Sequence, residues 1–460
     1  MTGSEQLSVN SEQLSVTSCG LSKIRFAARL LCVAYFSFFV FHFSLSQERC
    51  ATMKRDSLAA VKYRSWALQR KTLEDSVQII QKRNRLRGGN ARIGATCDVV
   101  RIPVVVHVIH DNMAGTIGGI NNANIADVQV LNQIRVLNED YRRKPNTKGF
   151  NKNSVGADLQ IEFFLATTDP SGKATNGITR HYYTDKRSFD IYSDEGVLAD
   201  IVSWPTDRYL NIWVVRATNT SYLGVAQFPS VSGIAGLDNS SELQDKVDGA
   251  IIDFRAFGTG GAIITRLYYL GRTATHEIGH WLGLLHTWGD TFCGTDFCND
   301  TPICESGNAG TNCGPKYSNC SGTRTLNMTE NYMDYSPDSC MNVFTVNQSE
   351  RIRAVLEASP RRAKLVRLAC TQLAYSTSLQ VEVYPNPTPN DLNVKVMLPA
   401  FGDFDVEMFS MTGQRVYGVQ YKGYPSWIVS IPTIDIANGQ YVVRVSTATE
   451  KITKRVILNR

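Results

Sequence analysis

The sequence has 460 residues, of which 43% are hydrophobic and 20% are charged. These values are typical of a folded protein with room for two or three domains, and they exclude a largely disordered chain. The net charge of +6 is unevenly spread, because basic residues outnumber acidic ones 13 to 4 between positions 49 and 101. The remaining body of the chain is slightly acidic, so nucleic acid is not an expected partner.

Positions 1–46 have the features of an N-terminal extension followed by an export signal. The hexapeptide Ser-Glu-Gln-Leu-Ser-Val occurs at 4–9 and again at 11–16, in a polar stretch that we expect to be unstructured. Lys23, Arg25 and Arg29 precede an uncharged apolar run at 30–45. This pattern indicates a signal peptide cleaved near Ser46. A transmembrane anchor is the alternative, although the run is short for a membrane span.

Positions 47–95 have the features of a pro-segment. Residues 57–87 have helical periodicity and strong helix formers, so we expect a helix there. The basic, glycine-containing stretch at 88–90 is a flexible break at which proteolytic cleavage is expected. A large folded domain is then expected to occupy residues 96–370.

Strands and helices alternate after position 101. A buried strand is expected at 102–109, an amphipathic helix at 125–141, and further strands at 161–166 and 210–215. Residues 224–229 are expected to form an edge strand, whose free backbone groups can pair with an extended polypeptide. The first half of this region therefore has an α/β-like pattern. His107, a lone histidine in a strand, is interpreted as a packing residue.

The strongest functional signal is the motif His276-Glu277-x-x-His280-x-x-Gly283-x-x-His286. On a helix His276 and His280 lie one turn apart on the same face, and Gly283 can end the helix so that His286 approaches them. Three neutral nitrogens and one open position are typical of a catalytic zinc site, with Glu277 as the general base. The alternative, a core helix with three buried histidines, leaves polar rings to satisfy in an apolar segment.

A second motif follows at 331–341, where Met333 and Tyr335 resemble the Met-turn of metzincins. Similar motifs surround it: Gly271-Arg272-Thr273-Ala274-Thr275, His286-Thr287-Trp288-Gly289-Asp290 and Phe344-Thr345-x-x-Gln348-x-x-Arg351. From about position 102 to 356 the sequence resembles the pappalysin family of metzincin zinc proteases. The resemblance implies an α+β metzincin catalytic domain with a twisted mixed sheet and a zinc-binding active-site helix.

The resemblance also assigns roles to residues around the motif. It implies that Tyr335 hydrogen-bonds the tetrahedral oxyanion and that Met333 forms the floor of the site. Asp338 matches a carboxylate that lines the pocket for the residue after the cut, which implies a preference for Arg or Lys there.

Cys50 lies in the stretch Arg49-Cys50-Ala51-Thr52, which resembles an Arg-Cys-Gly-Thr element of pappalysin pro-segments, with Ala51 as a departure. A Cys50 thiolate at the open zinc position would hold the enzyme latent. The alternative is a disulfide between Cys50 and Cys97.

Acidic residues gather after the zinc motif, among glycine, threonine and cysteine. The resemblance implies calcium in this region, with Asp296, Asp300 and Thr301 as candidate ligands, because calcium requires oxygen atoms on an irregular loop. The alternative is a solvated acidic loop.

Six of the eleven cysteines lie between positions 293 and 340. No Cys-x-x-Cys pair is present and the chain has an export signal, so disulfides are favoured over a second metal cluster. Pairing Cys293 with Cys320 and Cys313 with Cys340 agrees with the two bridges that the resemblance implies, but the sequence leaves the connectivity open.

The last part of the chain, residues 379–460, changes to alternating strands separated by turns. The periodicity alone predicts a small all-β sandwich. The segment resembles the C-terminal sorting domain of proteins exported by the type IX system of Bacteroidetes, which implies a role in export or surface attachment. A carbohydrate-binding or spacer module is the alternative.

Together these features predict a zinc endopeptidase that is secreted or attached to the cell surface. Its expected partners are polypeptide substrates and the type IX export machinery, and it is expected to be a monomer. Two other functions stay open: a non-catalytic surface adhesion protein on a metzincin scaffold, and a zinc hydrolase that acts on non-peptide amides.

Overall fold

The computed structural model describes residues 49–86, 99–219, 221–231, 246–261, 263, 265–372, 378–388 and 391–459. The predicted extension and signal peptide at 1–46, the expected cleavage region at 88–90, and Cys97 lie outside the described residues. None of the helices within these ranges combines the length and the apolar character needed to cross a membrane.

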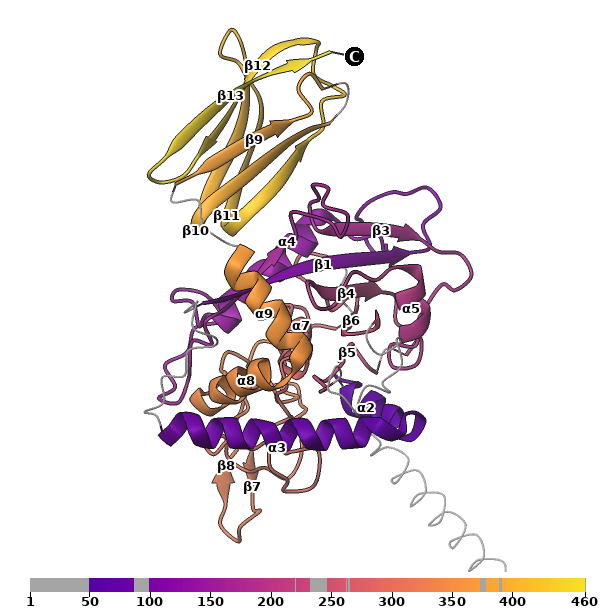
Figure 1. Ribbon diagram of the computed structural model, residues 1–460, viewed down its shortest axis with the longest axis vertical. Helices are drawn as coiled ribbons and strands as arrows, with labels where there is room; N and C mark the ends of the chain where they lie inside the picture. Colours follow the sequence, from indigo (N-terminus) through magenta and orange to yellow (C-terminus); the bar gives the residue numbers. More distant parts are fainter. Residues whose placement is uncertain are drawn as a thin grey trace, which may run out of the picture. The chain divides into compact units, whose positions relative to one another are not determined.

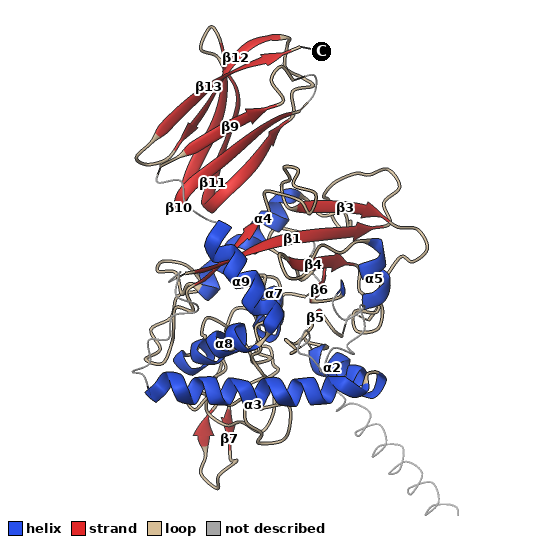
Figure 2. Cartoon of the chain, in the orientation of Figure 1, coloured by secondary structure: helices blue, strands red, loops and turns tan. Residues whose placement is uncertain are grey.

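A six-stranded mixed sheet forms the framework of the catalytic region (Figures 1 and 2). The strand order is β2-β1-β4-β6-β5, and β3 also pairs with β1. All pairs are parallel except β5 with β6, so the short strand β5 is an antiparallel edge. The strands are β1 (Val100–His110), β2 (Ile161–Leu165), β3 (Ile178–Tyr182), β4 (Leu210–Val215), β5 (Gly224–Ala226) and β6 (Gly249–Asp253).

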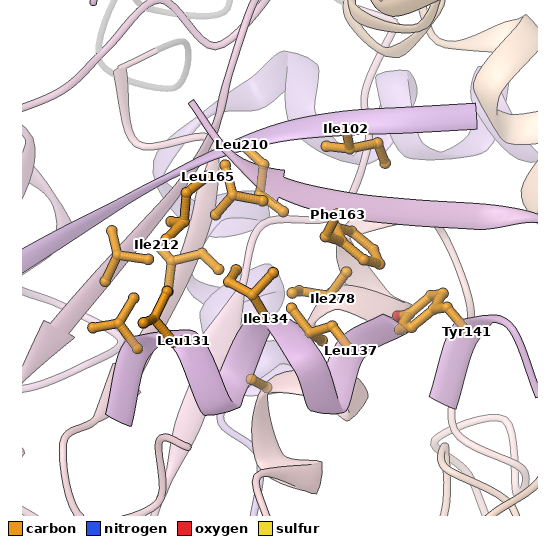
Figure 3. Close-up of a cluster of buried hydrophobic side chains, with 14 of the residues drawn as sticks. Ile102, Leu131, Ile134, Leu137, Tyr141, Phe163, Leu165, Leu210, Ile212 and Ile278 are labelled. Atoms are coloured by element: carbon orange, nitrogen blue, oxygen red, sulfur yellow. The ribbon is translucent and has the colours of Figure 1, made fainter. Parts of the chain in front are cut away.

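The central strands β1 and β4 are buried almost throughout and carry β-branched residues on both faces. This is expected of parallel strands that are covered on two sides. Helix α4 (Asp127–Tyr141) covers one face with an apolar stripe. Figure 3 shows Leu131, Ile134 and Leu137 of α4 beside side chains of β1, β2 and β4. Ile278 of helix α7 (Arg272–Trp281) joins the same cluster. The helix that carries the zinc motif is therefore fixed to the core of the domain.

The other face of the sheet is covered by a smaller apolar cluster around Trp213 of β4. Leu198 of the short helix α5 (Glu195–Ile201) and Phe189 contribute to it. After α7 the chain forms a long irregular stretch with the hairpin β7 (Tyr317–Ser318) and β8 (Thr325–Leu326). Helices α8 (Val346–Ala358) and α9 (Pro360–Gln372) follow, and α8 begins with a capping box between Thr345 and Gln348.

The stretch expected to form one helix at 57–87 contains two, α2 (Thr52–Lys62) and α3 (Arg64–Leu86). They are separated by Tyr63, whose backbone is extended. The break lets Trp66 become fully buried beside Phe228, while its Nε1 donates to Asp56 Oδ1 over 2.7 Å. Burial of a large aromatic ring accounts for the interruption of an otherwise regular helical pattern.

In the described part of the C-terminal region, the named strands pair antiparallel. They are β9 (Gln380–Tyr384), β10 (Leu392–Ser410), β11 (Arg415–Ile431), β12 (Gly439–Ser446) and β13 (Lys451–Leu458). The order is β11-β10-β12-β13, and β9 also pairs with β10. Register shifts divide the long β10–β11 pair into segments. The predicted fold class, an α+β domain with a mixed sheet followed by an all-β region, is confirmed.

Candidate active site

A carboxylate fixes the start of helix α7, and a glycine with positive φ follows its end. At its start, Asp338 Oδ2 accepts hydrogen bonds from the backbone nitrogens of Leu270 and Arg272, over 2.8 and 3.2 Å. At its end, Gly283 has φ +93°, and a Cβ there would lie 2.6 Å from Val355 Cγ2. The position therefore requires glycine for both its backbone conformation and its space. The chain then turns back toward α7 and reaches His286.

A buried carboxylate of helix α4 holds the first turn of α7. Asp140 Oδ1 accepts from Arg272 over 3.0 Å, and Asp140 Oδ2 accepts from Thr275 Oγ1 over 2.8 Å. The Arg272–Asp140 pair is buried, at 2% and 0% side-chain exposure. Truncating either partner would leave an uncompensated buried charge, so this pair constrains the orientation of α7.

The three motif histidines converge at their Nε2 atoms. The distances are 3.1 Å between His276 and His280, 3.1 Å between His280 and His286, and 3.2 Å between His276 and His286. Each Nδ1 has its own acceptor. For His276 it is the carbonyl oxygen of Tyr332 at 2.7 Å, and for His280 it is that of Leu284 at 2.8 Å. For His286 it is the carboxylate of Asp290. An Nδ1–H donor in each ring leaves Nε2 with its lone pair free for a metal.

This donor set fits a zinc ion. Nitrogens bound tetrahedrally at about 2.0–2.1 Å lie about 3.3 Å apart, close to the separations in the histidine cluster. Burial and the neighbouring rings lower the pKa values of His276 and His280 well below the usual value, so both rings are neutral, as metal binding requires. The Cys50 Sγ and the three histidines offer ligand atoms within 4.8 Å of one another, the one such group among the described residues.

Glu277 is fully buried beside this cluster. Its Oε2 accepts from Thr52 Oγ1 over 2.8 Å and from Cys50 Sγ over 3.3 Å, whereas Oε1 is buried and has no hydrogen-bond partner among the described residues. Burial raises the pKa of Glu277 to about 7, while the bonds from Thr52 and Cys50 and the charge of Arg49 oppose that rise. A carboxyl group with a pKa near neutrality can both accept and release a proton.

The aromatic wall of the site comes from the two segments after α7. The Tyr335 ring lies edge-to-face against His286 at 4.9 Å, and Trp288 stacks on His286 at 4.3 Å. The Tyr335 hydroxyl donates to the carbonyl oxygen of Cys50 over 3.4 Å. Met333 is buried under α7, so close that a Cβ at Gly279 would lie 2.4 Å from its Sδ.

Residues 49–51 lie along the edge strand β5. Cys50 forms a parallel bridge with Gly224. The N–H of Leu223 donates to the Arg49 carbonyl oxygen over 2.9 Å, and the N–H of Ala51 donates to the Gly224 carbonyl oxygen over the same distance. The Arg49 side chain reaches Asp338, with a distance of 3.1 Å between its terminal nitrogen and Asp338 Oδ1. Both side chains are completely buried. Residues 49–51 thus lie beside the three histidines and Glu277, and they contact the edge strand and Asp338.

The predicted calcium residues lie in two separate hydrogen-bonded groups. Both Asp296 oxygens accept from Thr301 Oγ1 at 2.8 Å, and burial raises the pKa of Asp296 to about 6. Asp300 accepts instead from Thr345 Oγ1 and from the backbone nitrogen of Asn347, over 2.7 and 2.8 Å. Asp300 thus ties this loop to the start of α8.

Two disulfides cross the irregular stretch after the motif. They link Cys293 with Cys320 and Cys313 with Cys340, the two pairs considered in the sequence analysis. Cys50, Cys298 and Cys304 are buried and not bridged.

Three residues with contacts to the site were not recognised as such from the sequence. Asp290 was named within the family motif that follows the third histidine, without a role, yet it hydrogen-bonds His286; its position four residues after that histidine could have indicated this. Thr52, which bonds Glu277, was named only within the resemblance at 49–52 and without a role. Asp140, which bonds Arg272, gave no local signal because its partner is more than 100 residues away. His107, interpreted as a packing residue, hydrogen-bonds Thr179 and Asn211 within the sheet.

Known proteins resemble the chain over the same regions. A family model described as pregnancy-associated plasma protein-A, peptidase M43, matches residues 192–357, and one described as a secretion system C-terminal sorting domain matches 382–459. An extracellular metalloprotease of Pyricularia oryzae is 29% identical over 268 residues, which are 58% of this chain and 78% of that protein.

Two solved structures from Tannerella forsythia are similar along almost their whole length. A promirolysin mutant is 33% identical, with a TM-score of 0.56, and the match covers 70% of this chain and 98% of that one. Mature mirolysin in complex with a cleaved peptide is 38% identical, with a TM-score of 0.51, and the match covers 59% of this chain and 97% of that one. The chain therefore belongs to the pappalysin family and is a secreted zinc metallopeptidase with a C-terminal type IX sorting domain.

Proposed function

We propose that this enzyme cleaves internal peptide bonds, with His276, His280 and His286 as zinc ligands and Glu277 as the general base. The observation that carries the proposal is the convergence of three Nε2 atoms beside a buried carboxyl group. A zinc ion held by these nitrogens would supply Lewis-acid chemistry, which acidifies water and polarises a carbonyl group.

The protein groups around the histidines divide the remaining tasks. Glu277 takes a proton from the attacking water and then delivers it to the leaving amine. Tyr335 donates a hydrogen bond to the developing oxyanion, a role supported by its present contact with the Cys50 carbonyl oxygen. Met333 packs beneath α7 without reaching substrate.

We propose that the substrate is an extended polypeptide that pairs with β5. Support comes from the pro-segment, whose backbone already forms hydrogen bonds with Leu223 and Gly224 on this edge. Asp338 then selects a basic side chain after the cut. The buried ion pair between Arg49 and Asp338 supports this preference, because it demonstrates that a guanidinium group can reach that carboxylate.

We further propose that residues 47–95 form a pro-segment that keeps the catalytic domain at 96–370 latent, after a signal peptide within 1–46 and before a sorting domain at 379–460. Burial and the charge of Glu277 raise the pKa of the Cys50 thiol, and a metal cation among the histidines would offset this by stabilising the thiolate. Cys50→Ala should therefore raise the peptidase activity of the uncut chain, whereas Cys304→Ala, at another buried and unbridged cysteine, should not. Equal activities in the two variants would contradict latency through Cys50.

Calcium at the loop after the zinc motif stays a prediction, with Asp296, Asp300 and Thr301 as candidate ligands. Calcium binding would stabilise the folded protein. A melting temperature that does not change between excess calcium and a calcium chelator would contradict it. We expect the enzyme to act as a monomer, which sedimentation would test.

Peptide-library cleavage by the processed enzyme, with mass spectrometry of the products, tests the proposed activity. We expect cuts inside polypeptides, before Arg or Lys, that stop when zinc is removed by a chelator and resume when zinc returns. Cleavage of non-peptide amides without cleavage of polypeptides would favour the other hydrolase, and zinc binding without turnover would favour an adhesion protein.

A further inference from the structure

Helix α3 of the pro-segment lies along helix α8, away from the stretch that contacts the metal cluster (Figures 1 and 2). Apolar side chains form the centre of this contact. They are Leu73 and Val77 of α3 with Val231, Ala354 and Val355 of the catalytic region. Leu73 and Val77 are spaced one helical turn apart, so one face of α3 is buried against α8.

Ion pairs connect the two helices around this apolar centre. Glu74 binds both terminal nitrogens of Arg351, over 2.6 and 2.9 Å, and the Arg351 side chain is only 2% exposed. Arg351 Nε also donates to the Gly283 carbonyl oxygen over 2.9 Å, which holds the guanidinium group in place. Nearer the end of α3, Arg83 pairs with Glu357 at 2.7 Å and Arg85 pairs with Glu350 at 3.2 Å.

The pro-segment contacts the enzyme along most of its length: between its two end contacts, Arg55 pairs with Glu195 and Trp66 packs against Phe228. Residues 49–52 contact Glu277, Asp338 and β5, whereas residues 73–85 contact α8. The connection through α2 and α3 is mostly helical, so binding at one place keeps the other end close to its own partners. Two linked contacts of this kind raise the effective concentration of each end into about the millimolar range.

We propose that the surface formed by Val231, Arg351, Ala354 and Val355, flanked by Glu350 and Glu357, is a docking site that keeps α3 bound after the chain is cut between residues 86 and 99. A single cut then leaves Cys50 at the metal cluster, and activity requires that α3 dissociate or be cut as well. The inference rests on the proposed latency, but the docking itself can be measured without any peptidase activity.

The experiment uses the full chain with the recognition sequence of an external, site-specific protease in place of residues 88–90. After that cut, gel filtration measures how long the pro-fragment co-elutes with the enzyme, and peptide hydrolysis is followed in parallel. We expect co-elution with no rise in activity. Glu74→Gln should shorten the bound lifetime roughly tenfold or more, because Arg351 loses its charged partner.

Asp75→Asn provides a matched control, since Asp75 is next to Glu74 but pairs with the exposed Lys71 of its own helix. It should leave the lifetime unchanged. A second test uses the exposed Arg83–Glu357 pair, at which folding is not at risk: Arg83→Glu should shorten the lifetime and adding Glu357→Arg should restore it.

Immediate release of the wild-type fragment, or equal lifetimes for Glu74→Gln and Asp75→Asn, would overturn the proposal. The variant Cys50→Ala weakens the contact at residues 49–52 by one side chain, and its fragment should still co-elute after the cut. Loss of co-elution in that variant would mean that α8 is no independent docking site. If co-elution is found but no peptide is hydrolysed under any condition, the proposed activity fails while the docking site stands.

Discussion

Replacing Asp290 by asparagine tests whether the carboxylate behind His286 strengthens metal binding. His286 Nδ1 lies against Asp290 Oδ1, and the two side chains are 1% and 13% exposed. The Asp290 backbone has φ 60°, in the left-handed region that asparagine also tolerates well. Asp290→Asn therefore removes the charge while it keeps the shape of the side chain and the path of the loop.

The expected loss can be bounded from the contact itself. Removing the partner behind a ligating histidine costs about 10- to 100-fold in metal affinity, or about 1.4 to 2.7 kcal/mol. Asparagine still offers an oxygen that can accept from His286 Nδ1, but without the charge that strengthens the bond. We therefore expect a loss near the lower limit, about tenfold.

Competition with a chelator of known zinc affinity, on the processed enzyme, measures this loss. Asp300→Asn is the matched control, because Asp300 lies in the same loop but bonds Thr345 and Asn347. The control should bind zinc like the wild type. The reasoning would be refuted by unchanged affinity in Asp290→Asn, or by the same loss in both variants.

Three further outcomes follow from the site. Glu277→Ala should keep zinc but lower kcat by about 10²- to 10⁴-fold, and turnover near the wild-type rate would exclude Glu277 as the base. Asp338→Asn should reduce the preference for Arg or Lys after the cut about tenfold or more, which product analysis checks against a neutral residue at that position. Burial raises the pKa of Asp296 from 3.8 to about 6, so the folded protein holds this proton more tightly than the unfolded chain. This group should lower the free energy of unfolding as pH rises from about 4 to about 6, by about 3 kcal/mol at most, and Asp296→Asn should remove that slope in calcium-free denaturant titrations.

The local part of the site could be predicted because it depends on spacing within one helix. His276 and His280 are one turn apart, and Gly283 ends the helix through its positive φ, so the motif alone indicates three converging nitrogens. The edge strand was expected at 224–229 and is found at Gly224–Ala226. These features need no knowledge of distant residues.

Other elements lacked a local signal. Strand β3 has the sequence Ile-Thr-Arg-His-Tyr, and its side chains are only partly buried or exposed, so it has no regular apolar alternation. Strand β6 begins with glycine and alanine, which are poor strand formers, and depends on pairing with β4 and β5. The break between α2 and α3 depends on the burial of Trp66 against Phe228, a contact with a residue far along the chain.

In the proposed function, residues 49–52 connect latency with specificity, because they contact the carboxyl groups of both Asp338 and Glu277. Arg49 lies against Asp338, while Cys50 and Thr52 donate to Glu277, and all of these side chains are buried. When the proposed pro-segment leaves, both carboxyl groups lose these partners and become accessible to substrate, while Asp338 keeps its bonds from the backbone nitrogens of Leu270 and Arg272. In the proposed mechanism the substrate replaces the lost partners, with a basic side chain at Asp338 and the attacking water at Glu277. A pro-segment that holds both groups thus competes directly with a basic substrate. Arg49→Met should therefore weaken latency even with Cys50 intact, because the pro-segment would then leave Asp338 available to substrate.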